Sequence, residues 1–232
     1  MISFKQIKKS YSRQVVLDIP LLEIPKGQTF GLVGNNGAGK TTLFSCLLDL
    51  IKPTSGRAIN NKVNVRESED WKSFTSAFLD DTFLISYLLP EEYFYFIGEL
   101  RKVPKRKVDE FLNQFQDLFN GEILNGKKYI RDLSKGNQKK VGIVAALIGE
   151  PEVIILDEPF ANLDPTTQIR LKKIIKKLSQ DRNITVLISS HDLQDVTEVS
   201  ERIVLLEKGK IVRDIKTSKE TLKELESYFT KD

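Results

Sequence analysis

The segment that most constrains the fold runs from Thr29 to Leu48, TFGLVGNNGAGKTTLFSCLL. In it a buried strand, a glycine-rich turn and a helix with apolar residues at helical spacing follow one another directly. Gly34, Gly37 and Gly39 allow backbone angles and close approaches that a Cβ would forbid, so successive N–H groups can converge on a polyphosphate. The segment therefore predicts an α/β core with a phosphate-binding turn.

The turn matches the pattern G-x-x-x-x-G-K-[ST] through Gly34, Gly39, Lys40 and Thr41. Lys40 would reach the β- and γ-phosphates of a nucleotide, and the Thr41 hydroxyl would ligate Mg²⁺. The helix that begins near Gly39 adds the positive end of its dipole. The other residues of this segment that are predicted to bind the nucleotide are Asn35, Asn36, Gly37, Ala38 and Thr42. The alternative is a glycine-rich turn with a surface lysine, and the apolar residues on both sides disfavour it.

Composition sets broad limits on the class of protein. A chain of 232 residues with 40% hydrophobic and 29% charged residues has the composition of one large or two small soluble domains. The single cysteine, Cys46, rules out an internal disulfide and is typical of a reducing compartment. We expect no secretion signal and no membrane span, because the apolar runs are shorter than the ~20 residues that a bilayer requires. If a membrane is involved, another chain must supply it.

The net charge of +4 is mild. Basic clusters occur at Arg101–Lys107, Lys127–Lys140 and Lys172–Lys177, and solvated surface is the default interpretation of each. The third cluster is predicted to be the outward face of a helix whose inward residues are Ile169, Ile174, Ile175 and Leu178. Nucleic-acid binding is not predicted, because the clusters are not interleaved with aromatic residues.

The N-terminal part predicts an antiparallel hairpin. Ile2–Ile7 and Val15–Ile24 are largely apolar and flank a polar turn at Ser10–Gln14. Tyr11 lies in that turn, where its ring could stack on an adenine or simply pack against its neighbours. The hairpin leads through a Pro-Lys-Gly turn into the strand before the phosphate-binding turn.

A helical segment interrupts the α/β pattern. The apolar strand Ser76–Asp80 ends in two carboxylates, Asp80 and Asp81, and helical periodicity with many aromatic residues follows to about Lys128. We predict a helical subdomain at about 81–140, inserted into a core formed by about 1–80 and 141–232. Packing accounts for most of these aromatic side chains, and their surface also suits the docking of a partner.

A second strand carries the catalytic candidates. Val153–Asp157 is a buried strand that ends in adjacent carboxylates, Asp157 and Glu158. Ligands of open α/β sheets lie at the carboxyl ends of the strands, so both carboxylates should lie beside the glycine-rich turn. Asp157 is then a Mg²⁺ partner, and Glu158 can hold and deprotonate an attacking water. Burial of two carboxylates is costly unless a cation or a substrate uses them.

Two further segments add weaker signals. Ser134 is a natural N-cap for the apolar helix at Val141–Ile148, and Gly136 lets a ligand approach the start of that helix. His191, the only histidine, ends the predicted buried strand Ile184–His191. A lone histidine is usually structural, but its position at the carboxyl end of a strand favours a role near the γ-phosphate.

Taken together, these motifs resemble the nucleotide-binding subunit of ABC transporters over essentially the whole chain. The motifs occur in the order of that family: an aromatic residue (Tyr11), Walker A (Gly34–Thr41), a signature-like LSKGN (Leu133–Asn137), Walker B and its glutamate (Asp157, Glu158), a D-loop (Ala161–Asp164) and a switch histidine (His191). The resemblance implies a P-loop NTPase fold of the RecA-like type. Such a fold has a mixed-sheet core, an antiparallel β part and an inserted helical subdomain.

The resemblance also implies a mode of action. Two ATPase subunits, identical or different, pack head to tail, and each ATP lies between the phosphate loop of one and the signature helix of the other. Ser134, Gly136, Asn137 and Asp164 would then contact nucleotide. Hydrolysis would drive separate transmembrane permease subunits that dock on the helical insert, so the chain would be cytoplasmic and peripheral on the inner face of the membrane. A lone subunit has only half of each site and should hydrolyse slowly.

The chain departs from the family pattern at two places. The family signature is LSGGQ, whereas this chain has Lys135, an extra cation, and Asn137, a shorter amide. Asp80 stands where the family carries the Q-loop glutamine, and a carboxylate there can ligate Mg²⁺ but cannot donate a hydrogen bond when ionised. Among the branches of the family, the chain is most similar to the ATPases of bacterial efflux systems for drugs, bacteriocins or ions.

Two other functions fit the same residues. One is a soluble ABC-type ATPase with a role outside transport, and the other is a nucleotide-sensing module with little turnover. Purification alongside a hydrophobic partner separates the first from a transport ATPase, and a turnover measurement separates the second.

Overall fold

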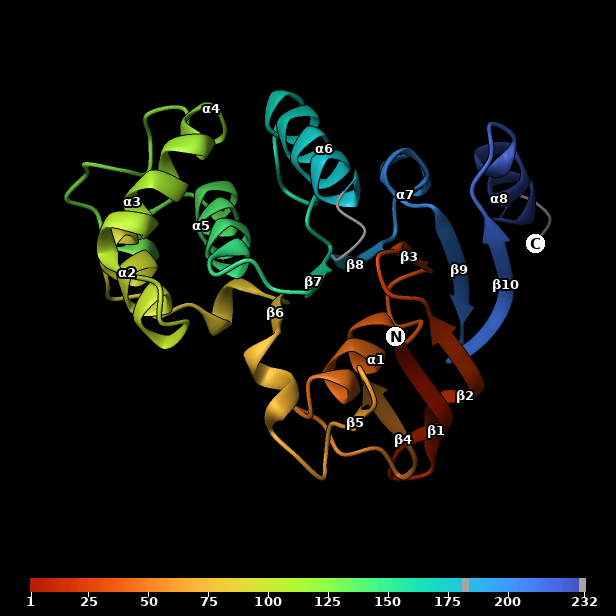
Figure 1. Cartoon of the computed structure of the whole chain (residues 1–232). Helices are drawn as coiled ribbons and strands as arrows, with labels where there is room; N and C mark the ends of the chain where they lie inside the picture. The colour runs from red at the N-terminus through yellow and green to blue at the C-terminus, as the bar shows by residue number, and fades with distance from the viewer. Residues whose placement is uncertain (181–183, 230–232) are drawn as a thin grey trace.

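The computed structural model describes residues 1–180 and 184–229, which form two sheets and a group of helices on one side (Figure 1). The smaller sheet is antiparallel and has the order β2-β1-β4-β5. Its strands are β1 (Ile2–Tyr11), β2 (Gln14–Ile24), β4 (Ser55–Asn60) and β5 (Val63–Asn64). The predicted hairpin is confirmed, since β1 and β2 pair along their whole length from Ile2↔Ile24 to Tyr11↔Gln14. Tyr11 is the last residue of β1 rather than part of the turn.

The larger sheet has the order β10-β9-β3-β8-β7-β6. Its strands are β3 (Thr29–Val33), β6 (Thr75–Phe78), β7 (Val153–Asp157), β8 (Thr185–Ser190), β9 (Arg202–Glu207) and β10 (Lys210–Lys216). All neighbouring pairs are parallel except β9 with β10. Every residue of β3, β7 and β8 is buried, as expected for parallel strands covered on both faces. The predicted mixed-sheet α/β core with an antiparallel part is therefore confirmed.

Alternate side chains of β7 point to opposite faces of this sheet, because side chains alternate along a strand. Ile155 packs in the cluster that contains α1 (Lys40–Leu47), while Ile154 and Leu156 pack under α5 (Lys135–Leu147) and α6 (Pro165–Gln180). A third cluster lies beneath α7 (Leu193–Val199) and α8 (Thr221–Phe229). The sheet is thus held from both sides, and its strand ends are fixed relative to one another.

The helical part lies on the β6 side of the sheet (Figure 1). It contains α2 (Pro90–Leu100), α3 (Lys105–Leu112) and α4 (Gln116–Phe119), together with the short 3₁₀ turns η2 (Asp81–Phe83), η3 (Asn113–Phe115) and η4 (Ile130–Asp132); a further turn, η1 (Asp70–Ser73), precedes β6. Phenylalanine rings fill its interior, with Phe94 and Phe119 5.9 Å apart between ring centroids. The proposed boundary at residue 140 falls inside α5, which begins at Lys135 and continues to Leu147.

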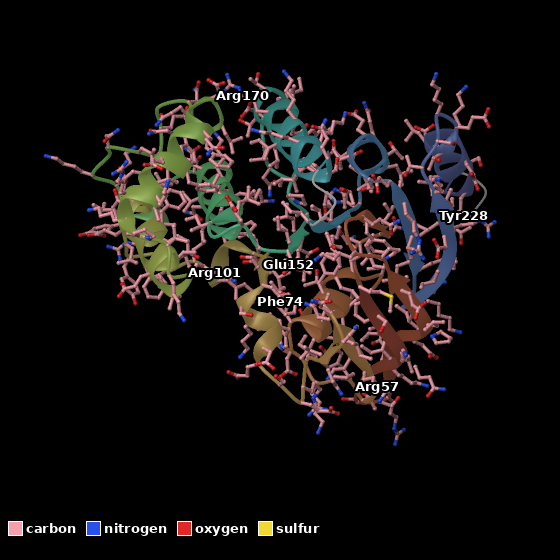
Figure 2. All side chains as sticks on the ribbon, in the orientation of Figure 1. Arg57, Phe74, Arg101, Glu152, Arg170 and Tyr228 are labelled. Atoms are coloured by element: carbon pink, nitrogen blue, oxygen red, sulfur yellow. The ribbon has the colours of Figure 1, made fainter. Side chains whose placement is uncertain are left out.

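Two arginines connect the helical part to the rest of the molecule (Figure 2). Arg101, at the end of α2, donates from Nη1 to the carbonyls of Lys72 and Ser73, each at 3.0 Å. Arg170 of α6 donates to the carbonyl of Asp117 in α4 at 2.5 Å. Because carbonyl oxygens are obligatory acceptors, these contacts stabilise chain segments that carry no sheet hydrogen bonds of their own.

The sequence prediction for α6 is wrong at two positions. Ile169 is 56% exposed, whereas Ile175 is buried as predicted. Lys172, predicted to face solvent, has its Nζ 2.8 Å from Asp195 Oδ1 and 3.2 Å from Glu198 Oε2. The reason is that α7 packs along α6 and supplies two carboxylates to the face on which Lys172 lies.

The strand predicted at residues 76–80 also ends earlier than expected. β6 stops at Phe78, because Asp80 caps η2 by accepting a hydrogen bond from the Thr82 N–H at 2.7 Å. No helix in the described part of the chain is both long enough and apolar enough to cross a membrane.

Candidate nucleotide-binding and hydrolysis site

The glycine-rich turn connects the end of β3 to α1. A Cβ at Gly34 would lie 2.3 Å from the carbonyl oxygen of Leu206, so the close packing of the loop on β9 requires glycine there. Gly39 is the N-cap of α1 with φ of +108°, and Gly37 has φ of +82°. A Cβ at Gly37 would meet no atom within 4 Å, so the outer side of the loop is open to a ligand. Positive φ and an open outer side are what a backbone cradle for phosphate requires.

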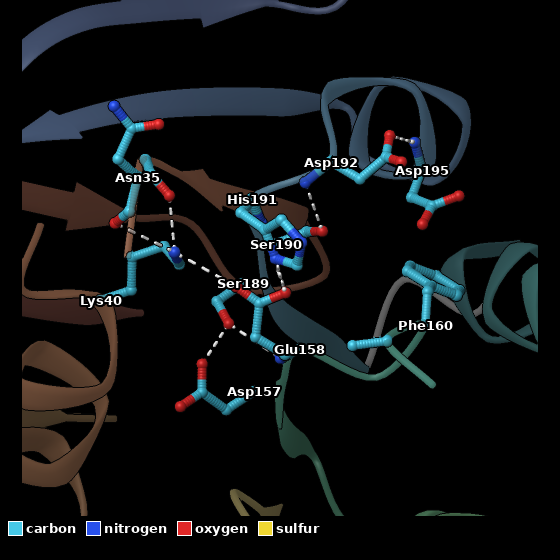
Figure 3. A network of polar contacts seen from close by, with 12 residues as sticks. Asn35, Lys40, Asp157, Glu158, Phe160, Ser189, Ser190, His191, Asp192 and Asp195 are labelled. Atoms are coloured by element: carbon cyan, nitrogen blue, oxygen red, sulfur yellow. Dashed lines mark hydrogen bonds and ion pairs between the residues drawn. The ribbon is translucent and has the colours of Figure 1, made fainter. Parts of the chain in front are cut away.

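Lys40 projects from the first turn of α1 towards the ends of β7 and β8 (Figure 3). Its side chain is only 6% exposed, and Nζ donates to the carbonyl of Gly34 at 2.6 Å. The same ammonium lies 3.1 Å from Glu158 Oε1. A buried lysine that is held by a carbonyl and a carboxylate is a fixed positive charge at the mouth of the loop.

The strand register explains how distant residues meet. Val33 of β3 pairs with Ser190 of β8, and Ser189 pairs with Asp157 at the end of β7. Because these strands are parallel neighbours, their carboxyl ends share one edge of the sheet. The loop after β3 and the carboxylates after β7 are therefore brought together, as the sequence analysis predicts.

Asp157 is a buried carboxylate with two hydroxyl partners. Thr41 Oγ1 donates to its Oδ2 at 2.5 Å, and Ser189 Oγ donates to its Oδ1. Burial raises the pKa of Asp157, while the hydrogen bonds from Ser189 and Thr41 oppose that rise. A hydroxyl and a carboxylate oxygen in contact are the hard ligands that suit Mg²⁺.

The donor set also limits what metal could bind. Among residues 1–180 and 184–229, no group of three or more His, Cys, Asp and Glu side chains is placed to hold a metal ion. Mg²⁺ commonly binds through one or two protein oxygens together with waters and substrate phosphates. Thr41 and Asp157 fit that arrangement and do not fit a site in which the protein supplies all the ligands.

Glu158 adopts an unusual backbone conformation. Its φ is +48°, in the left-handed region that side chains with a Cβ rarely enter. Its N–H donates to Ser189 Oγ at 2.9 Å and to the Ser189 carbonyl at 3.2 Å. Left-handed residues persist where their surroundings hold them, and they cluster at functional sites. This turn places the carboxylate between Lys40 and His191.

His191 follows β8 directly and contacts Glu158 twice. Its Nδ1 lies 2.8 Å from Glu158 Oε2, and its backbone N–H donates to the same oxygen at 3.3 Å (Figure 3). The imidazole side chain is half exposed. The histidine predicted to act near the γ-phosphate thus contacts the carboxylate predicted to activate water.

The signature-like segment begins α5. Ser134 is its N-cap, and its Oγ accepts the Asn137 N–H at 3.2 Å. The side-chain amide of Asn137 contacts Glu122 of the same chain, and its Nδ2 donates to Glu122 Oε2 at 3.0 Å. Lys135 forms an ion pair with Asp81 of η2. That contact lowers the pKa of the Asp81 carboxyl, because the positive charge favours its ionised form.

Gly136 lies against the D-loop. A Cβ there would come within 3.3 Å of the Asn162 carbonyl oxygen. The start of α5 and the loop after β7 are therefore in close contact.

Three predicted site residues have structural contacts of their own. Asp80 caps η2, and Asp164 Oδ1 accepts the Thr167 N–H at 3.0 Å at the start of α6. The hydrogen bonds from Thr167 lower the pKa of Asp164. Tyr11 is exposed, with Lys9 Nζ 4.7 Å from its ring centroid. The nucleotide and metal roles of these residues stay predictions.

Two further residues lie at the site and were not predicted from the sequence, Ser189 and Lys139. Ser189 is one of two serines that follow three consecutive aliphatic residues in its strand, and this change to polar residues was the available signal. Lys139 of α5 donates to the carbonyls of Glu158 at 2.7 Å and Ala161 at 2.8 Å. Burial lowers its pKa, while nearby carboxylates, Glu158 first, oppose that change. Lys139 was not predicted because it lies in the basic cluster Lys127–Lys140, which was interpreted as solvated surface.

Comparison with known proteins gives consistent matches. A family model described as "ABC transporter" matches residues 17–161. An uncharacterized ABC transporter ATP-binding protein of Bacillus subtilis, YhaQ, is 33% identical over 241 residues, covering all of this chain and 74% of that protein. The bacitracin transport ATP-binding protein BcrA of Enterococcus faecalis is 31% identical over 220 residues, covering 94% of this chain and 70% of that protein. The match to this chain covers 54% of the length of one further relative and 57% of the length of another.

The fold is also that of a known structure. The dimeric ATP-binding cassette MJ0796, solved in a post-hydrolysis state with ADP and Pi, superposes with a TM-score of 0.80 at 24% identity. The match covers 94% of this chain and 99% of that one. The RecA-like P-loop architecture expected from the resemblance is therefore the observed fold.

Proposed function

Because this chain belongs to the ABC transporter family of ATP-binding proteins, we propose that it binds ATP with Mg²⁺ at the turn ending in Lys40 and hydrolyses it with Glu158. The chain is an ATPase subunit of a transport system, and its partners are membrane-embedded permease subunits and a second ATPase subunit.

One observation supports the assignment of these residues to the nucleotide site. Thr41 lies 2.5 Å from Asp157, and Lys40 lies 3.1 Å from Glu158, although 116 positions separate Thr41 from Asp157 in the chain. A cation, a hydroxyl and two carboxylates at one sheet edge, beside an open glycine loop, form a site for a triphosphate and its metal. A structural explanation alone would not require so many buried polar groups in one place.

Each residue has a separate role in the proposed binding and hydrolysis of ATP. The loop N–H groups and Lys40 hold the β- and γ-phosphates, and Thr41 and Asp157 hold Mg²⁺. Bound Mg²⁺ would neutralise charge on the phosphate oxygens. Glu158 accepts a proton from water as the water oxygen bonds to the γ-phosphorus and the bond to the ADP oxygen breaks. His191 orients the Glu158 carboxylate through the contact at 2.8 Å.

The second subunit completes the site. Ser134, at the start of α5, and Gly136 present a helix N-terminus that suits the γ-phosphate of an ATP held by another copy. Three further residues complete the proposed site. The ring of Tyr11 stacks on the adenine, Asp80 ligates the metal, and Asp164 of the D-loop contacts the nucleotide. The turnover rate should therefore rise with subunit concentration.

A groove between the helical part and the sheet suits the permease. A cavity of about 380 Å³ is lined by residues of η1, β6, η2, α2 and α5. Two large apolar side chains on its rim, Phe83 and Leu100, are 59% and 65% exposed. Exposed apolar surface beside a concave site is typical of a docking surface for another protein. We place the chain at the cytoplasmic face of the membrane, held there by the permease.

The test is ATP turnover by the purified chain with Mg²⁺. Glu158→Gln should bind ATP but lose on the order of 10²- to 10⁴-fold in turnover, the contribution of a positioned base. A single-turnover assay measures the chemical step directly. Glu220→Gln is the matched control, because Glu220 is exposed just before α8 and is not part of the site.

The outcomes separate the candidate functions. Unchanged single-turnover hydrolysis in Glu158→Gln would remove Glu158 from the role of base. ATP binding without any turnover by the wild-type chain would favour the nucleotide-sensing module. Active chain that never purifies with a hydrophobic partner would favour an ATPase outside transport.

A further inference from the structure

We infer that Lys139 is a positioning residue for Glu158: from α5 it holds the turn at residues 158–161, so that the signature helix and the catalytic carboxylate move as one unit. The inference rests on the proposed hydrolytic role of Glu158. Lys139 itself touches neither the nucleotide nor the attacking water in this proposal.

The contact geometry supports a clamp. The Nζ of Lys139 donates to the Glu158 carbonyl at 2.7 Å and to the Ala161 carbonyl at 2.8 Å. The two acceptors lie at the two ends of the turn that leads out of β7. Charge-assisted hydrogen bonds of this length are among the stronger ones in proteins, and two of them from one atom fix the turn at both ends.

The turn needs such a restraint because Glu158 is in the left-handed region, with φ of +48°. Its N–H is already held by Ser189 of β8. Lys139 therefore restrains the opposite side of the same residue, its carbonyl. With N–H and carbonyl both fixed, the direction of the side chain towards Lys40 and His191 is determined by the backbone.

The helix that carries Lys139 also carries the signature. Lys139 lies one to two turns after Ser134, the N-cap of α5, and Gly136 of the same helix packs against the Asn162 carbonyl. A ligand that contacts the start of α5 would therefore act on a helix bonded to the backbone of Glu158. This supplies a physical route by which nucleotide on one subunit can influence the carboxylate on the other.

The experiment compares substitutions at one position. Lys139→Met keeps the length of the aliphatic stem but has no donor, and Lys139→Arg keeps both the donors and the charge. Lys139→Leu is a second variant without donors, with high helix propensity, in case the methionine variant folds poorly. Lys173→Met is the matched control, because Lys173 lies exposed on α6.

We expect Lys139→Met and Lys139→Leu to lower kcat roughly 10- to 100-fold, as the loss of an outer contact to a catalytic group commonly does. The Kd for ATP and the nucleotide-dependent dimer seen in sedimentation should be unchanged, because the phosphate loop is not altered. Lys139→Arg should restore most of the kcat, and Lys173→Met should match the wild type.

Two results would overturn the inference while leaving the proposed function intact. One is a wild-type kcat in both variants without donors. The other is a loss of ATP affinity as large as the loss of kcat, which would indicate a general defect of the site. A wild-type chain that binds ATP and never hydrolyses it would instead overturn the proposed function itself.

Discussion

At the scale of single residues, the two adjacent carboxylates of the site have different environments. Asp157 is buried against the hydroxyls of Thr41 and Ser189, whereas Glu158 faces Lys40 and the half-exposed His191. A carboxylate fixed by hydroxyls suits a metal ligand, and one that is hydrogen-bonded to an imidazole suits a base. One strand end thus presents two carboxylates in different environments, because the backbone turns sharply between the residues.

Lys40→Ala should weaken ATP binding itself. The substitution removes the buried ammonium proposed to bind the phosphates, and a hydrogen bond to a charged group is worth about 1.5–3 kcal/mol, or roughly 10- to 100-fold in affinity. Isothermal titration calorimetry with ATP and Mg²⁺ measures the change. Lys173→Ala is the control, and an unaltered affinity in Lys40→Ala would contradict the phosphate cradle.

The thiol of Cys46 should be unreactive in the folded chain. Burial raises its pKa from 9.0 to about 11. At pH 8 the thiolate is then on the order of 100-fold scarcer than in an unfolded chain. A raised pKa means that the stability contributed by the protonated thiol is complete below pH 9 and is lost as the pH rises through about 11.

The measurement is labelling with a disulfide reagent at about pH 8, near which the unfolded thiol reacts readily. We expect slow labelling of the native chain and one rapid equivalent in denaturant. Denaturation midpoints at neutral pH and in strong alkali, compared between wild type and Cys46→Ala, test the sign of the pH dependence. Equal labelling rates in native and unfolded chain would show that Cys46 is not enclosed as described.

At the scale of elements, α5 is important because of the segments that it contacts. It packs directly on β6, is capped by Ser134, and bonds through Lys135 to η2 and through Lys139 to the turn after β7. Lys135, the extra cation of the signature-like segment, is paired with Asp81. One helix therefore contacts three segments that the nucleotide or the permease would touch.

Gly142→Ala should destabilise the packing of α5 on β6. A Cβ at Gly142 would lie 2.1 Å from the Phe78 ring, far inside contact distance. Overpacking of this kind costs roughly 1–3 kcal/mol. Chemical denaturation gives the free energy of unfolding, and the double variant Gly142→Ala with Phe78→Leu should recover part of the loss because the ring is the obstacle.

At the scale of the whole molecule, the helical part and the sheet are joined by β6, α5 and the two arginine contacts, with the groove of about 380 Å³ between them. The groove and the proposed contact with a second copy's ATP lie at different parts of α5. Gly142 and Ala145 line the groove, and Ser134 caps the N-terminus of the helix. Under the proposed function, α5 would therefore connect ATP held by another copy of the chain to the permease.

Phe83→Asp should release the chain from its permease without loss of intrinsic turnover. An aspartate in the exposed apolar rim would have to be desolvated on docking, which is costly for an unpaired charge. Co-purification from detergent-solubilised membranes measures binding, and ATP turnover of the free chain serves as the internal check. Ile169→Asp, at a similarly exposed position on α6, is the control and should leave co-purification unchanged.

Much of the fold was predictable because its signals are local. The hairpin at the N-terminus, the strand–turn–helix around Lys40 and the buried strand before Asp157 are each visible in the pattern of neighbouring residues. The outward face of α6 was predicted wrongly, because the two acidic partners of Lys172 come from α7, and periodicity within one helix does not reveal what packs against it.

The sequence by itself determined the phosphate loop, the alternation of strands and helices, and the kinds of side chain available for chemistry, since each depends on the order of residues close together in the chain. Only the tertiary structure decided that Lys40 would meet Glu158, that Glu158 would be left-handed, and that Lys139 would hold its carbonyl. Those contacts arise where parallel strand ends share an edge, and the packing of whole elements sets the distances there.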